Sequence, residues 1–328
     1  MFVVQPKRRT HRKVAMHFWK HKFLNYLFAV LGLFIFLSCA RSGNREAGSV
    51  TPQLKEGRYI FNLQNQTLEI DPRVGGRITS LRIADKEFLT GRDVHPTNWG
   101  STFWPSPQSA WKWPPSATLD TMPYVASVQN NVLKLVSQQD PKLGYVFTKE
   151  ISADTKRLSF KIKYTITNQS TQTQQVAPWE ISRVFPKGLT FYPTGTGEPS
   201  GPLALFTEKK AGITWFDYQD SKIPAQDLKL FADGAEGWLA QVHAGILLVK
   251  QFPEVPANKA APAEAEIEIY SAKRKNYIEI EQQGSYSELA PGASTTWEVT
   301  WYLRQLPATI KAEPGNSELA AYVRKLVN

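Results

Sequence analysis

Regular alternation of apolar and polar residues is the feature that most constrains what this chain can fold into. It is clearest over residues 157–167, where the apolar positions are Leu158, Phe160, Ile162, Tyr164 and Ile166. Because successive side chains of a strand point to opposite faces, this spacing predicts a half-buried β-strand. Shorter runs of the same kind are Thr67–Asp71, Arg77–Ile83, Val132–Val136, Glu264–Tyr270, Tyr277–Glu281 and Thr296–Leu303. Clusters of Gly, Pro, Asn and Asp separate these runs, so the sequence predicts an all-β fold.

A helix is predicted only at the C-terminus, over Ser317–Val327. Asn316 or Ser317 can cap its first turn, and its apolar side chains recur at helical spacing: Leu319, Tyr322, Val323 and Leu326. We expect this helix to pack against a sheet and to take no part in chemistry.

The first 38 residues have the pattern of an export signal. A basic stretch without acids contains Lys7, Arg8, Arg9, Arg12, Lys13, Lys20 and Lys22. An uncharged, strongly apolar run follows over residues 23–38. A spanning helix needs about 20 apolar residues, so this run is short for a membrane span and typical of a signal core.

The end of this core, Phe36-Leu37-Ser38-Cys39-Ala40, resembles the lipobox of bacterial lipoproteins, with Phe36 where an aliphatic residue is usual. The resemblance implies cleavage before Cys39, multiple acylation of Cys39, and a membrane anchor in the cell envelope, at the outer membrane facing the periplasm. The alternative is that Cys39 is a small residue within an uncleaved anchor. If Cys39 is lipidated, residues 39–53 are the lipidated cysteine and a flexible tether, and residues 54–328 are the β domain.

Composition excludes one class of partner. The formal net charge of +10 includes the seven basic residues before Cys39, and the remaining Lys and Arg form only short clusters such as Lys209-Lys210 and Lys273-Arg274-Lys275. A nucleic-acid-binding domain has a basic stripe, so we expect no nucleic-acid partner. Cys39 is the only cysteine, which leaves no intramolecular disulfide.

Two stretches are similar to the galactose-mutarotase-like superfamily. Near the start, Leu68-Glu69-Ile70-Asp71, Gly75-Gly76-Arg77-Ile78, Ser80-Leu81-Arg82-Ile83 and Lys86-Glu87-Phe88-Leu89 resemble the opening of aldose epimerases. Near the end, Ile278-Glu279-Ile280-Glu281-Gln282-Gln283 and Leu289-Ala290-Pro291-Gly292 resemble their closing strands. The resemblance implies a large β supersandwich over the whole domain, with a short C-terminal helix.

The middle of the chain departs from the epimerases. Its segments Asn98-Trp99-Gly100 to Gln108 and Ala177-Pro178-Trp179-Glu180 resemble an uncharacterised subfamily of bacterial lipoproteins and secreted proteins within the superfamily. No activity comes with that resemblance.

The resemblance also suggests catalytic candidates. Mutarotation needs a base and an acid that reach one sugar, and Glu281 matches the superfamily's general base. Aldose epimerases take the acid from a His in mid-chain, but residues 177–183 contain none, which leaves His95 and the less well placed His243. Glu180 could instead pair with Glu281, as acid and base or as a glycosidase pair. Each carboxylate could also be an ordinary surface charge.

Aromatic residues crowd one Pro-rich stretch without strand periodicity, which predicts a loop: Trp99, Phe103, Trp104, Trp111 and Trp113. With Trp179, such rings suit the apolar face of a sugar, and Arg77 and Arg183 are candidate polar partners. The loop could instead fold inward as a lid over the core, or touch a bilayer.

No cluster of Cys, His or acidic residues predicts a metal, and no Gly-rich loop predicts a phosphate cofactor. We therefore predict a lipid-anchored protein that binds a carbohydrate or glycan. The alternatives are an epimerase or other carbohydrate-active enzyme using Glu281 as base, and an envelope-assembly lipoprotein that binds a protein partner.

Overall fold

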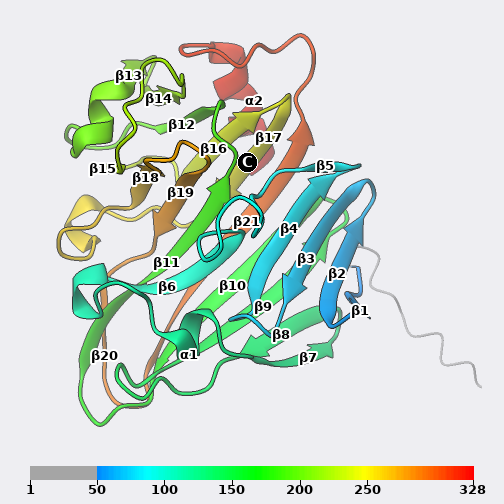
Figure 1. The fold of residues 1–328 in the computed structure, drawn as a ribbon, viewed down its shortest axis with the longest axis vertical. Helices are drawn as coiled ribbons and strands as arrows, with labels where there is room; N and C mark the ends of the chain where they lie inside the picture. The colour runs from blue at the N-terminus through cyan, green and yellow to red at the C-terminus, as the bar shows by residue number, and fades with distance from the viewer. Residues whose placement is uncertain (1–49) are drawn as a thin grey trace, which may run out of the picture. The chain divides into compact units, whose positions relative to one another are not determined.

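The computed structural model describes residues 50–328, in which two large antiparallel sheets pack face to face (Figure 1). The first has eleven strands, nine of them side by side in the order β1 (Gln53–Lys55), β2 (Arg58–Leu63), β3 (Gln66–Asp71), β4 (Arg77–Ile83), β6 (Ser101–Ser106), β11 (Gln174–Val184), β19 (Ile278–Gln283), β18 (Ile267–Ser271) and β15 (Leu228–Ala232). Two short strands attach to it, β5 (Lys86–Glu87) to β4 and β20 (Ser287–Leu289) to β11.

The second sheet has ten strands, in the order β13 (Thr207–Lys210), β14 (Ile213–Asp217), β12 (Leu189–Pro193), β16 (Trp238–His243), β17 (Ile246–Gln251), β21 (Ser294–Gln305), β10 (Ser159–Asn168), β9 (Tyr145–Asp154), β8 (Val132–Val136) and β7 (Val125–Gln129). Strands far apart in sequence are thus neighbours, as with β10 and β21. The chain has the β-sandwich architecture that its alternation and its family resemblance predicted.

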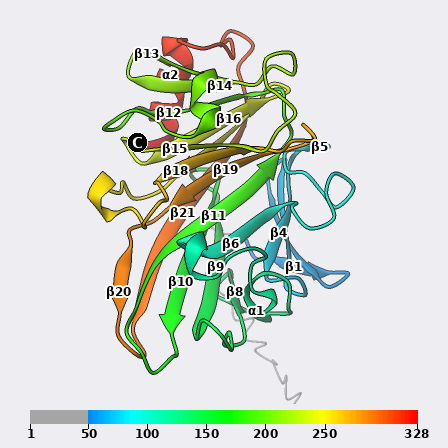
Figure 2. The same ribbon diagram turned by 60° about the vertical axis from the view of Figure 1, so that its left-hand side comes forward.

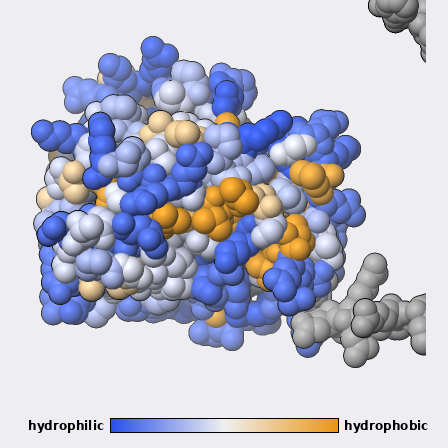
Figure 3. Space-filling model, turned by 90° about the horizontal axis from the view of Figure 1, so that it is seen from below, coloured by the Kyte–Doolittle hydropathy of each residue, from blue (hydrophilic) through white to orange (hydrophobic). Residues whose placement is uncertain are grey.

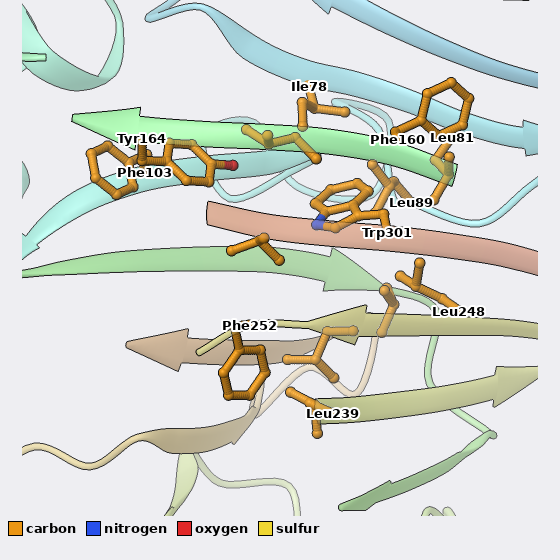
Figure 4. Close-up of a cluster of buried hydrophobic side chains, with 14 of the residues drawn as sticks. Ile78, Leu81, Leu89, Phe103, Phe160, Tyr164, Leu239, Leu248, Phe252 and Trp301 are labelled. Carbon is orange, nitrogen blue, oxygen red and sulfur yellow. The ribbon is translucent and has the colours of Figure 1, made fainter. Parts of the chain in front are cut away.

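The main core lies between the two sheets (Figure 4). Phe103 from β6 stacks on Tyr164 from β10, with 4.3 Å between ring centroids, and Trp301 from β21 is fully buried. Such stacked pairs add about 0.5–1.5 kcal/mol beyond the burial of their area. This contact joins the first sheet to the second at β6, the strand that also contains Trp104.

A second, smaller core lies on the outer face of the ten-stranded sheet, under α2 (Ser317–Val327) (Figures 1 and 2). Leu319 and Val323 pack against Phe191, Trp215 and Trp238. The side chain of Asn316 caps the helix by accepting from the amides of residues 318 and 319. The other helix, α1 (Ala117–Asp120), is a single turn, and the 3₁₀ turns are Gln108–Ala110, Pro202–Phe206 and Ala257–Lys259. In the described part of the chain, no helix is long and apolar enough to span a membrane.

The predicted strands and the C-terminal helix are all present, with ends shifted by up to three residues. One prediction was wrong. The aromatic stretch is not entirely loop, because residues 101–106 form β6 and every one of them is buried. Phe103 faces the other sheet and Trp104 faces the opposite side, where aromatic side chains also cover it. Since both faces are covered, the apolar–polar alternation that reveals a half-exposed strand is missing.

The predicted signal, Cys39 and most of the tether lie outside the described residues. The proposed domain boundaries at 38/39 and 53/54 therefore stay predictions.

Apolar surface is sparse on residues 50–328. The large hydrophobic side chains that remain exposed are Leu54, Trp113, Met122, Val125, Val128 and Leu205. Seen from below, apolar patches lie near the middle and toward one side of a mostly hydrophilic face (Figure 3). Val125 and Val128 belong to β7, an edge strand of the ten-stranded sheet.

The Gly75-Gly76 turn joins β3 to β4 and is closely packed. Both glycines have positive φ, +73° and +55°, and a buried lysine, Lys149, donates to their carbonyl oxygens at 2.8 and 3.1 Å. A Cβ added to Gly75 would lie 2.0 Å from the carbonyl oxygen of Asp120. Only glycine fits this position without displacing α1.

We predict that Gly75→Ala lowers the free energy of unfolding by roughly 2–5 kcal/mol, because it combines left-handed strain with overpacking. Gly212→Ala is the matched control. Gly212 has the same φ of +73° but open space around it. Gly212→Ala should therefore lower the free energy of unfolding by only about 1–2 kcal/mol, through backbone strain alone. Urea unfolding of the two variants measures the difference, and equal losses would contradict the packing argument.

Candidate functional site

Five adjacent strands of the eleven-stranded sheet, β6, β11, β19, β18 and β15, build one surface on the face turned away from the core. Their register aligns Trp104 with Trp179 on one line and Arg183, Glu279, Tyr270 and Lys229 on another. Because side chains alternate along a strand, these residues project to the same side while their neighbours enter the core. Residues from five separate segments therefore meet on one face.

This face contains a cleft of about 690 Å³. Its aromatic lining is His95, Trp104, Trp113, Trp179, Tyr270 and Tyr277. Its charged lining is Asp227, Lys229, Lys273, Arg274 and Glu279. A concave site of this size with rings and a few fixed polar groups is typical of small-molecule sites.

Trp104 is the centre of the aromatic lining. Its ring meets Trp111, Trp113 and Trp179 edge to face, with centroids 5.8, 5.8 and 5.6 Å away. Its Nε1 donates to Asp120 Oδ1 at 2.8 Å, which fixes the ring plane. Trp113 is 54% exposed and is therefore the ring most available to a ligand.

Two of the predicted site residues, Arg77 and Trp99, do not line the cleft but support its rim. Arg77 is buried and pairs with Asp120 at 3.0 Å, and burial lowers the pKa of Arg77 to about 10. It also donates to the carbonyl oxygen of Thr97 at 2.9 Å. The centre of the Trp99 ring lies 4.6 Å from the guanidinium carbon of Arg77 and 4.8 Å from that of Arg92. These contacts fix the loop that carries His95.

His95 itself lines the cleft. Its Nδ1 accepts from the amides of Asn98 at 2.9 Å and Thr97 at 3.3 Å, and its ring meets Tyr277 edge to face. Burial, then the charge of Arg274, lower the pKa of His95, so the neutral imidazole is favoured at neutral pH. With Nδ1 accepting, the proton of the neutral ring belongs on Nε2.

Arg183 lies just under the cleft, fully buried. Its Nε donates to Glu279 Oε1 at 2.8 Å, its Nη1 donates to Thr102 Oγ1 at 2.6 Å, and its guanidinium covers the Trp104 ring. Its Nη2 has no partner among the described residues. Arg183 therefore fixes one carboxylate and one tryptophan of the cleft.

Glu281 lies below the floor and has no exposed surface. Its Oε2 accepts from Trp179 Nε1 at 2.9 Å and from Lys229 Nζ at 3.2 Å, while its Oε1 has no partner among residues 50–328. Lys229 also pairs with Glu268, at 2.5 Å, and it is Lys229 that lines the cleft. Two buried carboxylates thus share one ammonium group.

Burial raises the pKa of both Glu281 and Glu268. Burial alone would lower the pKa of Lys229, but the charges of the two carboxylates outweigh it and raise that pKa above its ordinary value. Lys229 therefore stays protonated at neutral pH and can act as a hydrogen-bond donor to a ligand, not as a base.

Glu180 is not brought together with Glu281. It pairs with Gln282 across β19, so its side chain enters the space between the sheets, on the opposite face from Glu281. There it accepts from Lys250 Nζ at 2.6 Å and from Trp301 Nε1 at 3.3 Å. This buried pair belongs to the core, and the two glutamates cannot act on one substrate.

Several cleft residues were missed from sequence: Asp227, Lys229, Tyr270, Lys273, Arg274 and Tyr277. Lys229 lies in the alternating run Leu228–Ala232, which would have predicted another strand with Lys229 and Phe231 on one face. Glu279 shares the face of Glu281, as its alternation with Ile278 and Ile280 predicted. In the described residues, no group of three or more His, Cys, Asp or Glu side chains could bind a metal ion.

Comparison with known proteins places the chain in a family. Residues 105–304 match the family described as "Domain of unknown function (DUF4380)". The chain belongs to this family. No curated protein matches the sequence of this DUF4380 protein.

Its fold is that of galactose mutarotase-like proteins. A putative aldose 1-epimerase from Klebsiella pneumoniae has a TM-score of 0.55 at 11% identity, over 83% of this chain and 85% of its own. A putative aldose 1-epimerase from Escherichia coli K12 has a TM-score of 0.54 at 12% identity, over 76% and 99%. A galactose mutarotase-like protein from Lactobacillus casei has a TM-score of 0.53 at 12% identity, over 76% and 100%. At these identities the likeness shows the fold alone.

Lys229→Met should destabilise the DUF4380 domain by about 3 kcal/mol or more near neutral pH, because two buried carboxylates lose their cation. The loss should shrink as the pH falls toward the ordinary carboxyl pKa, since both glutamates are then protonated in the folded and the unfolded chain. Urea unfolding across this pH range measures it.

Lys161→Met is the control, because its ion pair with Glu298 is exposed and should contribute about 1 kcal/mol at most. Adding Glu268→Gln and Glu281→Gln to Lys229→Met should recover stability. A pH-independent loss with no recovery would contradict the charge argument.

Proposed function

We propose that this DUF4380 protein is a lipid-anchored envelope protein that binds carbohydrate in the cleft. The observation that carries the proposal is the joint lining of one 690 Å³ cleft by tryptophan and tyrosine rings and by fixed polar groups. Sugars present an apolar ring face and a rim of hydroxyls, which such a lining complements. Structural relatives named as putative aldose 1-epimerases support the same class of ligand.

Binding without turnover is favoured over mutarotation by the state of Glu281. A general base must lie within hydrogen-bond reach of the hydroxyl it deprotonates. Glu281 has no exposed surface, and Lys229 and Trp179 occupy its Oε2. The second candidate, an epimerase, is supported by the unpartnered Oε1 of Glu281 and by His95 in the same cleft.

Trp113→Ala should weaken sugar binding by about tenfold, the equivalent of roughly 1.4 kcal/mol, because the exposed ring of the cleft is lost. Titration calorimetry with glycans selected on an array measures the change, and tryptophan fluorescence should respond to the same glycans. Val125→Ala is the matched control. It also truncates an exposed apolar side chain, but on β7, and should leave affinity unchanged. An array without any bound glycan would sink the proposal.

The same glycans show whether the protein only binds sugar or also catalyses its epimerisation. For a binder, the wild-type protein should not accelerate anomer exchange of any aldose above buffer in polarimetry. If the wild type accelerates the exchange and Glu281→Gln lowers that rate by about 10²–10⁴-fold, the protein is an epimerase instead.

The anchor is tested separately. Cys39→Ala should leave an unlipidated precursor or a soluble product, since acyl chains on this residue are the proposed anchor. Membrane fractionation and intact mass measure the change. Unchanged partitioning together with unchanged mass would exclude lipidation of Cys39.

A further inference from the structure

The turn between β18 and β19 places two cations at the mouth of the cleft. Lys273 and Arg274 are exposed there and line it. The turn is fixed on both sides: the amide of Lys273 donates to Asp227 Oδ1 at 2.9 Å, and Asn276 Nδ2 donates to the carbonyl oxygen of Val94 at 2.8 Å. The two basic side chains therefore start from a fixed position beside the site.

Within the part of the chain that the structure describes, neither cation is held by a direct contact, although the charge of Lys273 is one of the causes that lower the pKa of Asp227. Among residues 50–328, the side chains of Lys273 and Arg274 form no ion pair and no hydrogen bond, although Lys229, which lines the same cleft, pairs with two carboxylates. The charge of Arg274 nonetheless reaches into the cleft, because it contributes, after burial, to the lowered pKa of His95.

The carboxylates in and below the cleft, in contrast, each have at least one donor partner. Glu279 pairs with Arg183, and Glu281 and Glu268 surround Lys229. Asp227 accepts from the Tyr270 hydroxyl at 2.5 Å as well as from the turn. The hydrogen bond from Tyr270 is the main cause that lowers the pKa of Asp227. The charged side chains at this mouth that have neither an ion pair nor a hydrogen bond within the described chain are therefore Lys273 and Arg274.

We propose that the ligand of the cleft is an acidic carbohydrate, whose anionic group binds Lys273 and Arg274 while its rings lie along the tryptophans. This inference rests on the proposed function and narrows it. Guanidinium and ammonium groups bind carboxylate, sulfate and phosphate through charge-assisted hydrogen bonds, about twice as strong as neutral ones. A neutral sugar would leave both cations unused.

The test compares matched sugars on the full-length protein in detergent. The probes are a neutral oligosaccharide and its uronate, in which only the exocyclic hydroxymethyl is replaced by a carboxylate, together with sulfated and phosphorylated forms of the same sugar. At low salt the wild type should bind at least one acidic form about tenfold more tightly than the neutral one. That advantage should fall as salt screens the exposed charges.

Two double variants distinguish the effect of these two cations from the effect of the protein's net charge. Lys273→Gln with Arg274→Gln should lower the affinity for the acidic sugar to that for the neutral one, because only the acidic sugar has an anionic group for these two cations to bind. Lys134→Gln with Lys142→Gln removes the same charge from exposed residues that do not line the cleft and should preserve the preference.

The outcomes are distinguishable. Equal binding of neutral and acidic sugars by the wild type would overturn the inference and leave the proposed function standing. If the preference for the acidic sugar survives in the Lys273→Gln, Arg274→Gln variant, the inference is likewise overturned and the proposed function stands. Binding of no sugar from either set would overturn the proposed function, and the inference with it.

Discussion

The alternation of side chains along β11 is the constraint on which the rest of this structure depends. On one face, Trp179 lines the cleft and Arg183 lies just under it, and on the other, Glu180 and Ser182 enter the space between the sheets. A slip of one residue against β6 or β19 would exchange the two sets. It would bury Trp179 and Arg183 among core residues and place the Glu180 carboxylate in the cleft. Register along β11 therefore determines both the core and the site.

Buried charges on both faces make that register specific. Three cations pair with acids on other strands: Lys250 with Glu180 across the sandwich, Arg183 with Glu279, and Lys229 with Glu281 and Glu268. Such pairs contribute little net stability, because desolvation of the charges offsets their attraction. Separating them, however, would leave an uncompensated charge in the interior. We infer that the pairs act mainly against alternative registers, and those near the cleft also orient its side chains.

Sequence reasoning succeeded where one face of a strand is buried and the other is not. β10 is such a strand, and its alternation predicted it directly. It failed for β6, because both faces are covered and the pattern carries no period. Of the predicted site residues, His95, Trp104, Trp113 and Trp179 line one cleft, while Arg77 and Trp99 support its rim. Lys229 could not be connected to Glu281 from sequence, because 52 residues separate them and only the order of β15, β18 and β19 brings them together.

The Gly75-Gly76 turn, part of the resemblance to aldose epimerases, supports the cleft without lining it. Lys149 donates to its carbonyl oxygens, and its close approach to Asp120 leaves no room for a Cβ at Gly75. The carboxylate of Asp120 then accepts from Arg77 through one oxygen and from Trp104 through the other. A change in the turn would therefore reach the central ring of the cleft through one carboxylate. Packing under the site therefore requires Gly75 whether a ligand in the cleft is bound or transformed.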